Sequence, residues 1–141
     1  EGYYAKYSRN FNLNILLEKS IKTNFQEVPL SGKIDKIEFI STHEARIIDY
    51  KTGKFSNAKN KLQKPLEKND FLGGDYWRQI VFYKILIEQD PQINWQMQYG
   101  VMDFVEAEKS EFYQAVFDIT QAEQQVVEQQ ILETYEKIKN L

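Results

Sequence analysis

The sequence predicts an α+β domain in which a central sheet is flanked by helices. Three observations support this class: segments of alternating polarity fill the first third of the chain, an apolar helical pattern follows at residues 75–89, and a hairpin pattern and an amphipathic stripe come last. A length of 141 residues with 42% hydrophobic side chains is the usual size of one domain. We therefore expect one domain over residues 1–141.

Three strands are expected before residue 52. Residues 13–25 alternate between apolar and polar side chains, which is typical of a half-buried strand, and the Val-Pro pair at 28–29 is expected to end it. Residues 30–40 and 45–51 predict two more strands, and the segment 41–44 between them is short enough for a hairpin. Together these segments predict an antiparallel meander.

A polar segment follows at residues 55–72. It is rich in lysine and asparagine, carries Pro65 and leads to Gly73 and Gly74, so it is too long and polar for a routine connection. We interpret it as a candidate substrate loop and expect it to be mobile without DNA, because its lysines repel each other and few apolar residues anchor it.

Two helices and a second hairpin complete the expected fold. Asp75 suits the start of a helix that runs to about residue 89, and apolar residues surround most of that helix, so it should be largely buried. Pro91 stops it. Residues 95–105 and 112–117 predict another hairpin, and Thr120 opens a final amphipathic helix.

Composition excludes several classes of protein. The chain has no cysteine, so disulfides, thiolate nucleophiles and iron–sulfur clusters are excluded and any metal must sit on oxygen or imidazole. No apolar run approaches the roughly 18 residues of a membrane span, and no signal pattern opens the chain, so we expect no membrane partner and a cytoplasmic protein. The formal charge of -3 gives no global basic field; the basic charge is local to the lysines after residue 50. The start without an initiator Met suggests a piece excised from a longer protein.

The residues that could take part in a reaction lie at the end of the third expected strand. Asp49 and Lys51 are two apart, so their side chains project from one face. Asp35 on the preceding strand joins them only if opposed residues sum to an even number such as 84 or 86, which we expect to require an odd number of residues in the turn. Two aspartates among apolar residues would repel each other unless a cation joins them. Mg²⁺ or Mn²⁺ suits Asp35, Asp49 and the backbone carbonyl of Tyr50, while Lys51 would orient water or stabilise developing charge.

Three motifs carry a family resemblance. The segments L-S-G-K-I-D-K-I-E, R-I-I-D-Y-K-T-G-K and Q-I-V-F-Y occur in order, on an expected strand, strand and helix. In these the chain resembles the PD-(D/E)xK nucleases, and among them the RecB- and AddA-like nuclease domains of helicase-nucleases. The resemblance implies a restriction-endonuclease-like core, with a central mixed sheet that contains an antiparallel meander.

The resemblance also implies roles for individual residues. It makes Asp35 and Asp49 metal ligands and Lys51 the catalytic lysine. Gln79 and Tyr83 match the family's Q-x-x-x-Y signature and lie on one helix face, where they would contact substrate or satisfy buried backbone groups. Lys54 is a candidate for phosphate contact.

The chain departs from the family pattern in two ways. Family members usually have an upstream helix whose His or Glu completes the metal shell, and no such His precedes Asp35. The absence of cysteine places the chain in the branch without an iron–sulfur cluster. Glu18 has the opposite parity from the apolar residues of its strand, and we expect it to face water.

These observations predict a Mg²⁺-dependent DNA nuclease that binds DNA. The resemblance implies a helicase motor of the same polypeptide as its partner and a role in DNA repair and recombination. Two alternatives stay open. One is a catalytically silent DNA-binding or interaction module with the nuclease fold; the other is a stand-alone phage- or restriction-type exonuclease.

Overall fold

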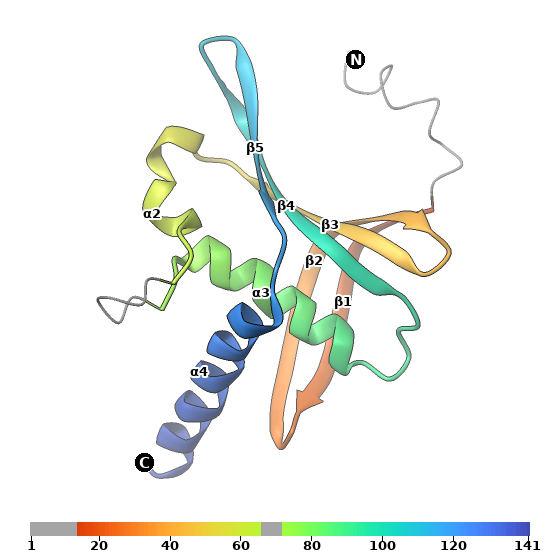
Figure 1. Ribbon diagram of the computed structural model, residues 1–141, viewed down its shortest axis with the longest axis vertical. Coiled ribbons are helices and arrows are strands. Elements are labelled where there is room, and N and C mark those ends of the chain that lie inside the picture. The colour runs from red at the N-terminus through yellow and green to blue at the C-terminus, as the bar shows by residue number, and fades with distance from the viewer. Residues whose placement is uncertain (1–13, 66–71) are drawn as a thin grey trace.

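The protein is described by a computed structural model, which places residues 14–65 and 72–141. Five strands form one sheet in the order β1-β2-β3-β4-β5, in which only β3 and β4 are parallel neighbours (Figure 1). The strands are β1 (Ile15–Phe25), β2 (Val28–Ser41), β3 (Glu44–Lys51), β4 (Gln96–Glu108) and β5 (Glu111–Phe117). Parallel neighbours need a crossover connection, and the segment containing α3 (Asp75–Gln89) supplies it. The expected α+β class, with a mixed sheet and an antiparallel meander, is confirmed.

The first strand pair differs in detail from the expectation. A two-residue turn at Gln26 and Glu27 joins β1 to β2, and Gln26 takes a φ of 54°. Pro29 does not end a strand but pairs with Asn24 inside β2. Because that pairing lies on the outermost hairpin, the missing proline N–H interrupts the sheet only at its margin.

Helices α3 and α4 (Gln121–Lys139) cover one face of the sheet (Figure 1). Helix α3 is largely buried, as its apolar residues predict, and seven of its residues are buried. Gly100 lets α3 approach β4, because a Cβ there would lie 2.5 Å from Cγ2 of Ile80. At the start of α4, Thr120 and Glu123 form the two reciprocal hydrogen bonds of a capping box.

The register of β2 and β3 is the one that the site requires. Opposed residues sum to 84, as in the pairs Lys36–Ile48 and Ile37–Ile47. The turn itself has two residues, not an odd number, and the expectation about its length was wrong. An irregularity between Phe39 and Ser41 adds one residue to β2 and restores the even sum.

The polar segment after β3 begins with two short helices, η2 (Phe55–Asn57) and α2 (Lys59–Leu62). Between them Ala58 is 4% exposed and joins the core. The rest of the expected loop includes residues 66–71, which lie outside the described residues, and its mobility without DNA stays a prediction.

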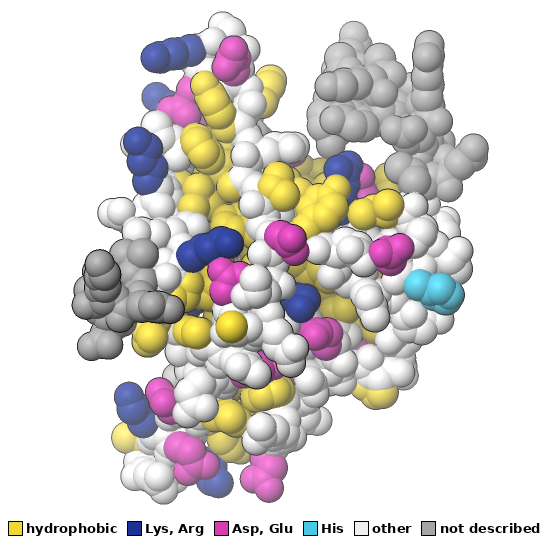
Figure 2. All heavy atoms as spheres, in the orientation of Figure 1, with side chains coloured by type: hydrophobic (Ala, Val, Ile, Leu, Met, Phe, Trp, Pro, Cys, Tyr) yellow, Lys and Arg dark blue, Asp and Glu magenta, His cyan; other side chains and the backbone are white. Residues whose placement is uncertain are grey.

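The surface carries both signs of charge. In the view of Figure 2, Lys and Arg side chains lie among Asp and Glu side chains, in keeping with the small net charge. Apolar side chains gather along the β4–β5 hairpin in the same view, where Val105, Phe112 and Val116 are exposed. Within the described residues, no helix is long and apolar enough to cross a membrane.

Candidate active site

Asp49 and Lys51 meet at the carboxyl end of β3, on the face that α3 covers. Asp49 is 3% exposed, and Nζ of Lys51 lies 2.9 Å from its Oδ2. The ammonium also donates a hydrogen bond to Oε1 of Gln79 at 2.7 Å. Two strand residues of equal parity and one helix residue thus converge on a single spot.

Asp35 reaches the same spot from β2. The β2–β3 ladder ends at the Lys36–Ile48 pair, so Asp35 and Asp49 are the next opposed residues in that register. There a side-chain contact replaces the backbone pairing: Oδ2 of Asp35 accepts a hydrogen bond from the backbone N–H of Tyr50 at 2.9 Å. The last backbone pairing of the two strands is thus followed by a side-chain contact, which brings the Asp35 carboxylate to the residue after Asp49.

Gln79 and Tyr83, one turn apart on α3, hold Asp49 from the helix side. The hydroxyl of Tyr83 donates to Oδ1 of Asp49 at 2.9 Å and accepts a hydrogen bond from Nε2 of Gln79 at 2.7 Å. The Gln79 amide therefore accepts from Lys51 through its oxygen and donates to Tyr83 through its nitrogen. Gln79 thus contacts both Lys51 and Asp49, and Tyr83 contacts Asp49.

The protonation of Tyr83 matches this arrangement. Burial first, and the negative charge of Asp49 second, hold the pKa of Tyr83 well above its ordinary value. The hydroxyl consequently keeps its proton at neutral pH and can donate it to Asp49.

The residues present fit a hard divalent cation. Oδ2 of Asp49 is buried and accepts no hydrogen bond, because Nζ of Lys51 approaches it outside hydrogen-bond geometry. The ammonium of Lys51 offsets one of the two aspartate charges that meet here, so the second charge favours a further cation. Among the described residues no three His, Cys, Asp or Glu side chains form a cluster. Asp35 and Asp49 would thus leave most positions to the Tyr50 carbonyl, water and substrate oxygens, as Mg²⁺ commonly does.

A family model for the PD-(D/E)XK nuclease superfamily matches residues 4–140. The chain belongs to this superfamily. No curated protein sequence matches the chain.

Two solved structures are similar to this chain. A candidate exonuclease from Eubacterium rectale superposes with a TM-score of 0.55 at 10% identity, over 98% of this chain and 47% of its own. The alkaline exonuclease LHK-Exo from Laribacter hongkongensis gives a TM-score of 0.44 at 9% identity, over 96% of this chain and 66% of its own. The first likeness supports the restriction-endonuclease-like fold alone, and the chain spans about half the length of that protein.

Two other residues singled out in the sequence lie apart from this PD-(D/E)XK site. Lys54 is exposed after β3, and its charge acts on Glu108, whose pKa is lowered chiefly by a hydrogen bond from Ser56. No contact joins Lys54 to Asp49 or Lys51. Glu18 is exposed as expected, with a φ of 52°, and its carboxylate lies 3.8 Å from Nζ of Lys33.

Sequence reasoning missed Tyr76, whose ring centroid lies 4.3 Å from Nζ of Lys51. The spacing contains a signal that would have found it, because Tyr76 precedes Gln79 by three residues and so shares its helix face. An aromatic ring under an ammonium stabilises the cation at a partly desolvated site.

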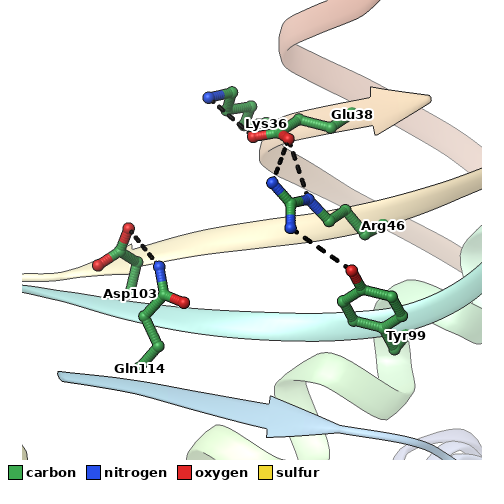
Figure 3. Close-up of polar contacts among 6 residues, drawn as sticks. All are labelled: Lys36, Glu38, Arg46, Tyr99, Asp103 and Gln114. Atoms are coloured by element: carbon green, nitrogen blue, oxygen red, sulfur yellow. Dashed lines mark hydrogen bonds and ion pairs between the residues drawn. The ribbon is translucent and has the colours of Figure 1, made fainter. Parts of the chain in front are cut away.

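A second polar cluster, on the opposite face of the sheet, was also missed (Figure 3). Glu38 is 7% exposed, accepts from Nε of Arg46 at 2.9 Å and pairs with Lys36 at 2.9 Å, while Arg46 also donates to the hydroxyl of Tyr99 at 3.4 Å. Burial opposes the charge of Glu38, but these cations hold its pKa below the ordinary value. Two cations already neutralise this carboxylate, so it does not resemble the Asp49 site.

Proposed function

We propose that this chain is a metal-dependent DNA nuclease domain that hydrolyses phosphodiester bonds with Mg²⁺ or Mn²⁺. The observation that supports it best is the convergence of Asp35, Asp49 and Lys51, with one buried Asp49 oxygen left without a hydrogen bond. Asp35 and Asp49 would hold the ion, together with the carbonyl of Tyr50. When bound, the ion would supply a Lewis acid that offsets phosphate charge and lowers the pKa of water.

The protein's own groups have distinct tasks in this proposal. Lys51 places an ammonium beside the aspartates, where it can orient the attacking water or stabilise charge on the phosphoryl oxygens. Gln79 fixes that ammonium through its amide oxygen, and Tyr83 fixes Asp49 through its hydroxyl. Both helix residues therefore position reacting groups, whatever further contact they make with substrate.

We further propose that the domain works as the nuclease module of a RecB- or AddA-like helicase-nuclease, on DNA that the motor domain delivers. The support is the resemblance of the D-Y-K-T-G-K and Q-x-x-x-Y segments. A second candidate is a stand-alone exonuclease, which the structural likeness to the Eubacterium rectale protein favours. ATP dependence of DNA degradation by the full-length polypeptide distinguishes the two, because only a motor-driven enzyme requires ATP.

The nuclease proposal is tested with the full-length protein, labelled linear DNA and added Mg²⁺ or Mn²⁺. We expect degradation that stops with a chelator, and a loss of at least about 100-fold in rate for Lys51→Ala, the usual effect of removing a group that stabilises transition-state charge. Asp49→Asn should be equally inactive, because the amide cannot serve as an anionic ligand.

Asp103→Asn is the matched control, since Asp103 lies on the opposite face of the neighbouring strand β4 and only accepts a hydrogen bond from Gln114 (Figure 3). It should cut at the parental rate. A parental protein that binds DNA without cutting it, or a Lys51→Ala variant that cuts as well as the parent, would leave the silent DNA-binding module as the better account.

A further inference from the structure

Two ammonium groups share the ring of Tyr76. Nζ of Lys51 lies 4.3 Å from the ring centroid, and Nζ of Lys61, from α2, lies 5.0 Å from it. The negative face of the ring attracts both ammonium groups and so offsets part of the repulsion between them. The remaining positive field lies beside the candidate scissile position and favours an anion there.

The position of Lys61 is built into the fold. Helix α2 packs on the start of α3 at Gly74, where a Cβ would collide with the backbone oxygens of Asn60 and Lys61. Gly74 also donates its N–H to the carbonyl of Gln63 at 2.8 Å, and Ala58 anchors the other end of α2 in the core. Figure 1 shows α2 beside the first turn of α3. Lys61 is therefore carried by a docked element at a fixed distance from Tyr76.

Lys51 and Lys64 are paired with carboxylates, whereas Lys61 is paired with none among the described residues. Lys51 pairs with Asp49 at 2.9 Å, and Lys64 pairs with Glu123 at 3.3 Å. Lys61 is exposed and, among the described residues, contacts no carboxylate; the Tyr76 ring is its one recorded partner. A long ammonium side chain that lies near a reaction centre, and has no anionic partner among the described residues, suits a substrate phosphate.

We propose that Lys61 binds the backbone phosphate adjacent to the scissile one, so that Lys51, Tyr76 and Lys61 form one row along the substrate strand. This inference rests on the proposed nuclease function and adds a substrate contact to it. Lys51 acts at the reacting phosphate, while Lys61 acts in binding. These three residues would contact the phosphate backbone of the DNA and no base, so they would contribute affinity without sequence preference.

The test compares Lys61→Ala with Lys59→Ala in the full-length protein. Lys59 is the matched control, because it is an exposed lysine of the same four-residue helix and contacts no partner in residues 14–65 and 72–141. For Lys61→Ala we expect KM for DNA to rise about tenfold with kcat changed less than about threefold. The slope of log KM against log salt should become shallower by about 1, the effect of losing one phosphate contact. Lys59→Ala should match the parent, and Lys61→Arg should retain most of the affinity.

A neutral phosphate analogue locates the contact. Oligonucleotides with one methylphosphonate on either side of the cut bond remove a single charge from the substrate. At one of the two positions the modification should weaken binding by the parent and by Lys59→Ala. Lys61→Ala should bind the modified and the unmodified oligonucleotide equally well. Equal sensitivity of all three proteins at both positions would overturn the proposal.

The failure of this inference is separable from failure of the nuclease function. If the parental protein degrades DNA but Lys61→Ala and Lys59→Ala behave alike in KM and in salt slope, the Lys61 contact is wrong and the nuclease proposal stands. If the parental protein does not degrade DNA, the nuclease proposal itself fails.

Discussion

At the scale of single residues, the side chain of Gln79 has a chemistry that few others could replace. Its amide oxygen accepts from Lys51 and its amide nitrogen donates to Tyr83, so one group connects a cation with the hydroxyl that holds Asp49. A glutamate there would repel Asp49, and a lysine would repel Lys51. An amide, which has an acceptor and two donors and no charge, satisfies both neighbours.

The Tyr83→Phe variant tests the role of that hydroxyl. The ring and its packing are kept, but Oδ1 of Asp49 loses its 2.9 Å hydrogen bond. We expect cleavage to fall about 10- to 100-fold, as for other partners that orient metal ligands. The free energy of unfolding at pH 7 should fall by about 1–3 kcal/mol. Unchanged activity would show that Tyr83 does not position Asp49.

The same variant should also change how stability depends on pH. Because the pKa of Tyr83 is raised in the folded state, the unfolded protein loses this proton first as pH rises above about 10. The folded state then binds one more proton than the unfolded state, so stability falls as pH increases there. Urea unfolding between pH 9 and 11 should show a shallower decline for Tyr83→Phe than for the parent.

At this scale the sequence predicts which residues belong to the candidate site better than it predicts which residues contact one another. Asp35, Asp49 and Lys51 were singled out by strand parity and motif, and the structure brings them together. Tyr76 and the Glu38–Arg46 pair were missed. The second omission has a physical reason: charged residues inside a strand look like solvent-facing positions until the sheet shows which of them face each other.

At the scale of elements, the β2–β3 hairpin shows how a correct register can arise from a turn of unexpected length. An even sum of opposed residues follows from the need to place Asp35 beside Asp49, and that part was predictable. The irregularity between Phe39 and Ser41 was not, because alternation of polarity locates a strand without revealing an extra residue in it. Helix α3 was the easier element, since its apolar residues surround the helix and thereby predict burial.

The Gly74→Ala variant tests the docking of α2 on α3. A Cβ at this position would meet backbone oxygens, which cannot rotate away as a side chain could, so α2 must move. We expect faster amide hydrogen exchange at Leu62, whose N–H donates to the carbonyl of Ala58 at 3.0 Å, and a rise in KM for DNA similar to that of Lys61→Ala.

Gly53→Ala is the control for Gly74→Ala, because a Cβ at Gly53 has open space around it. It should leave both hydrogen exchange and KM unchanged. If Gly74→Ala exchanges at the parental rate, α2 is held by other contacts than this close approach.

At the scale of the whole molecule, the two faces of the sheet differ in kind. Helices cover the face of Asp49, so the Asp49 carboxylate is buried under α3, while Asp35 and Lys51 at the end of the β2–β3 pairing are only partly buried. The opposite face carries the Glu38 cluster and exposes apolar residues along β4 and β5. The α+β class was predictable from periodicity, but the parallel pairing of β3 with β4 was not, since it joins segments more than 40 residues apart.

The response of global stability to metal follows from the same layout. Without an ion, Asp35 and Asp49 have only the ammonium of Lys51 to offset their two charges, and a ligand that binds only the folded state adds RT ln(1 + [L]/Kd) to the free energy of unfolding. At ten times Kd this is about 1.4 kcal/mol, which raises Tm by roughly 4–6 °C for a domain of this size. Mg²⁺ or Mn²⁺ should produce such a rise in a thermal melt.

Asp49→Asn should abolish the metal-dependent rise in Tm while leaving the metal-free Tm nearly unchanged, because the lost attraction to Lys51 is offset by relief of the repulsion from Asp35. Asp103→Asn removes one carboxylate from the opposite face and should keep the full rise, which excludes a general effect of ionic strength. The melt needs no DNA and no cleavage, so it examines the metal site independently of catalysis. A rise of equal size in the parent, Asp49→Asn and Asp103→Asn would place the ion elsewhere on the protein.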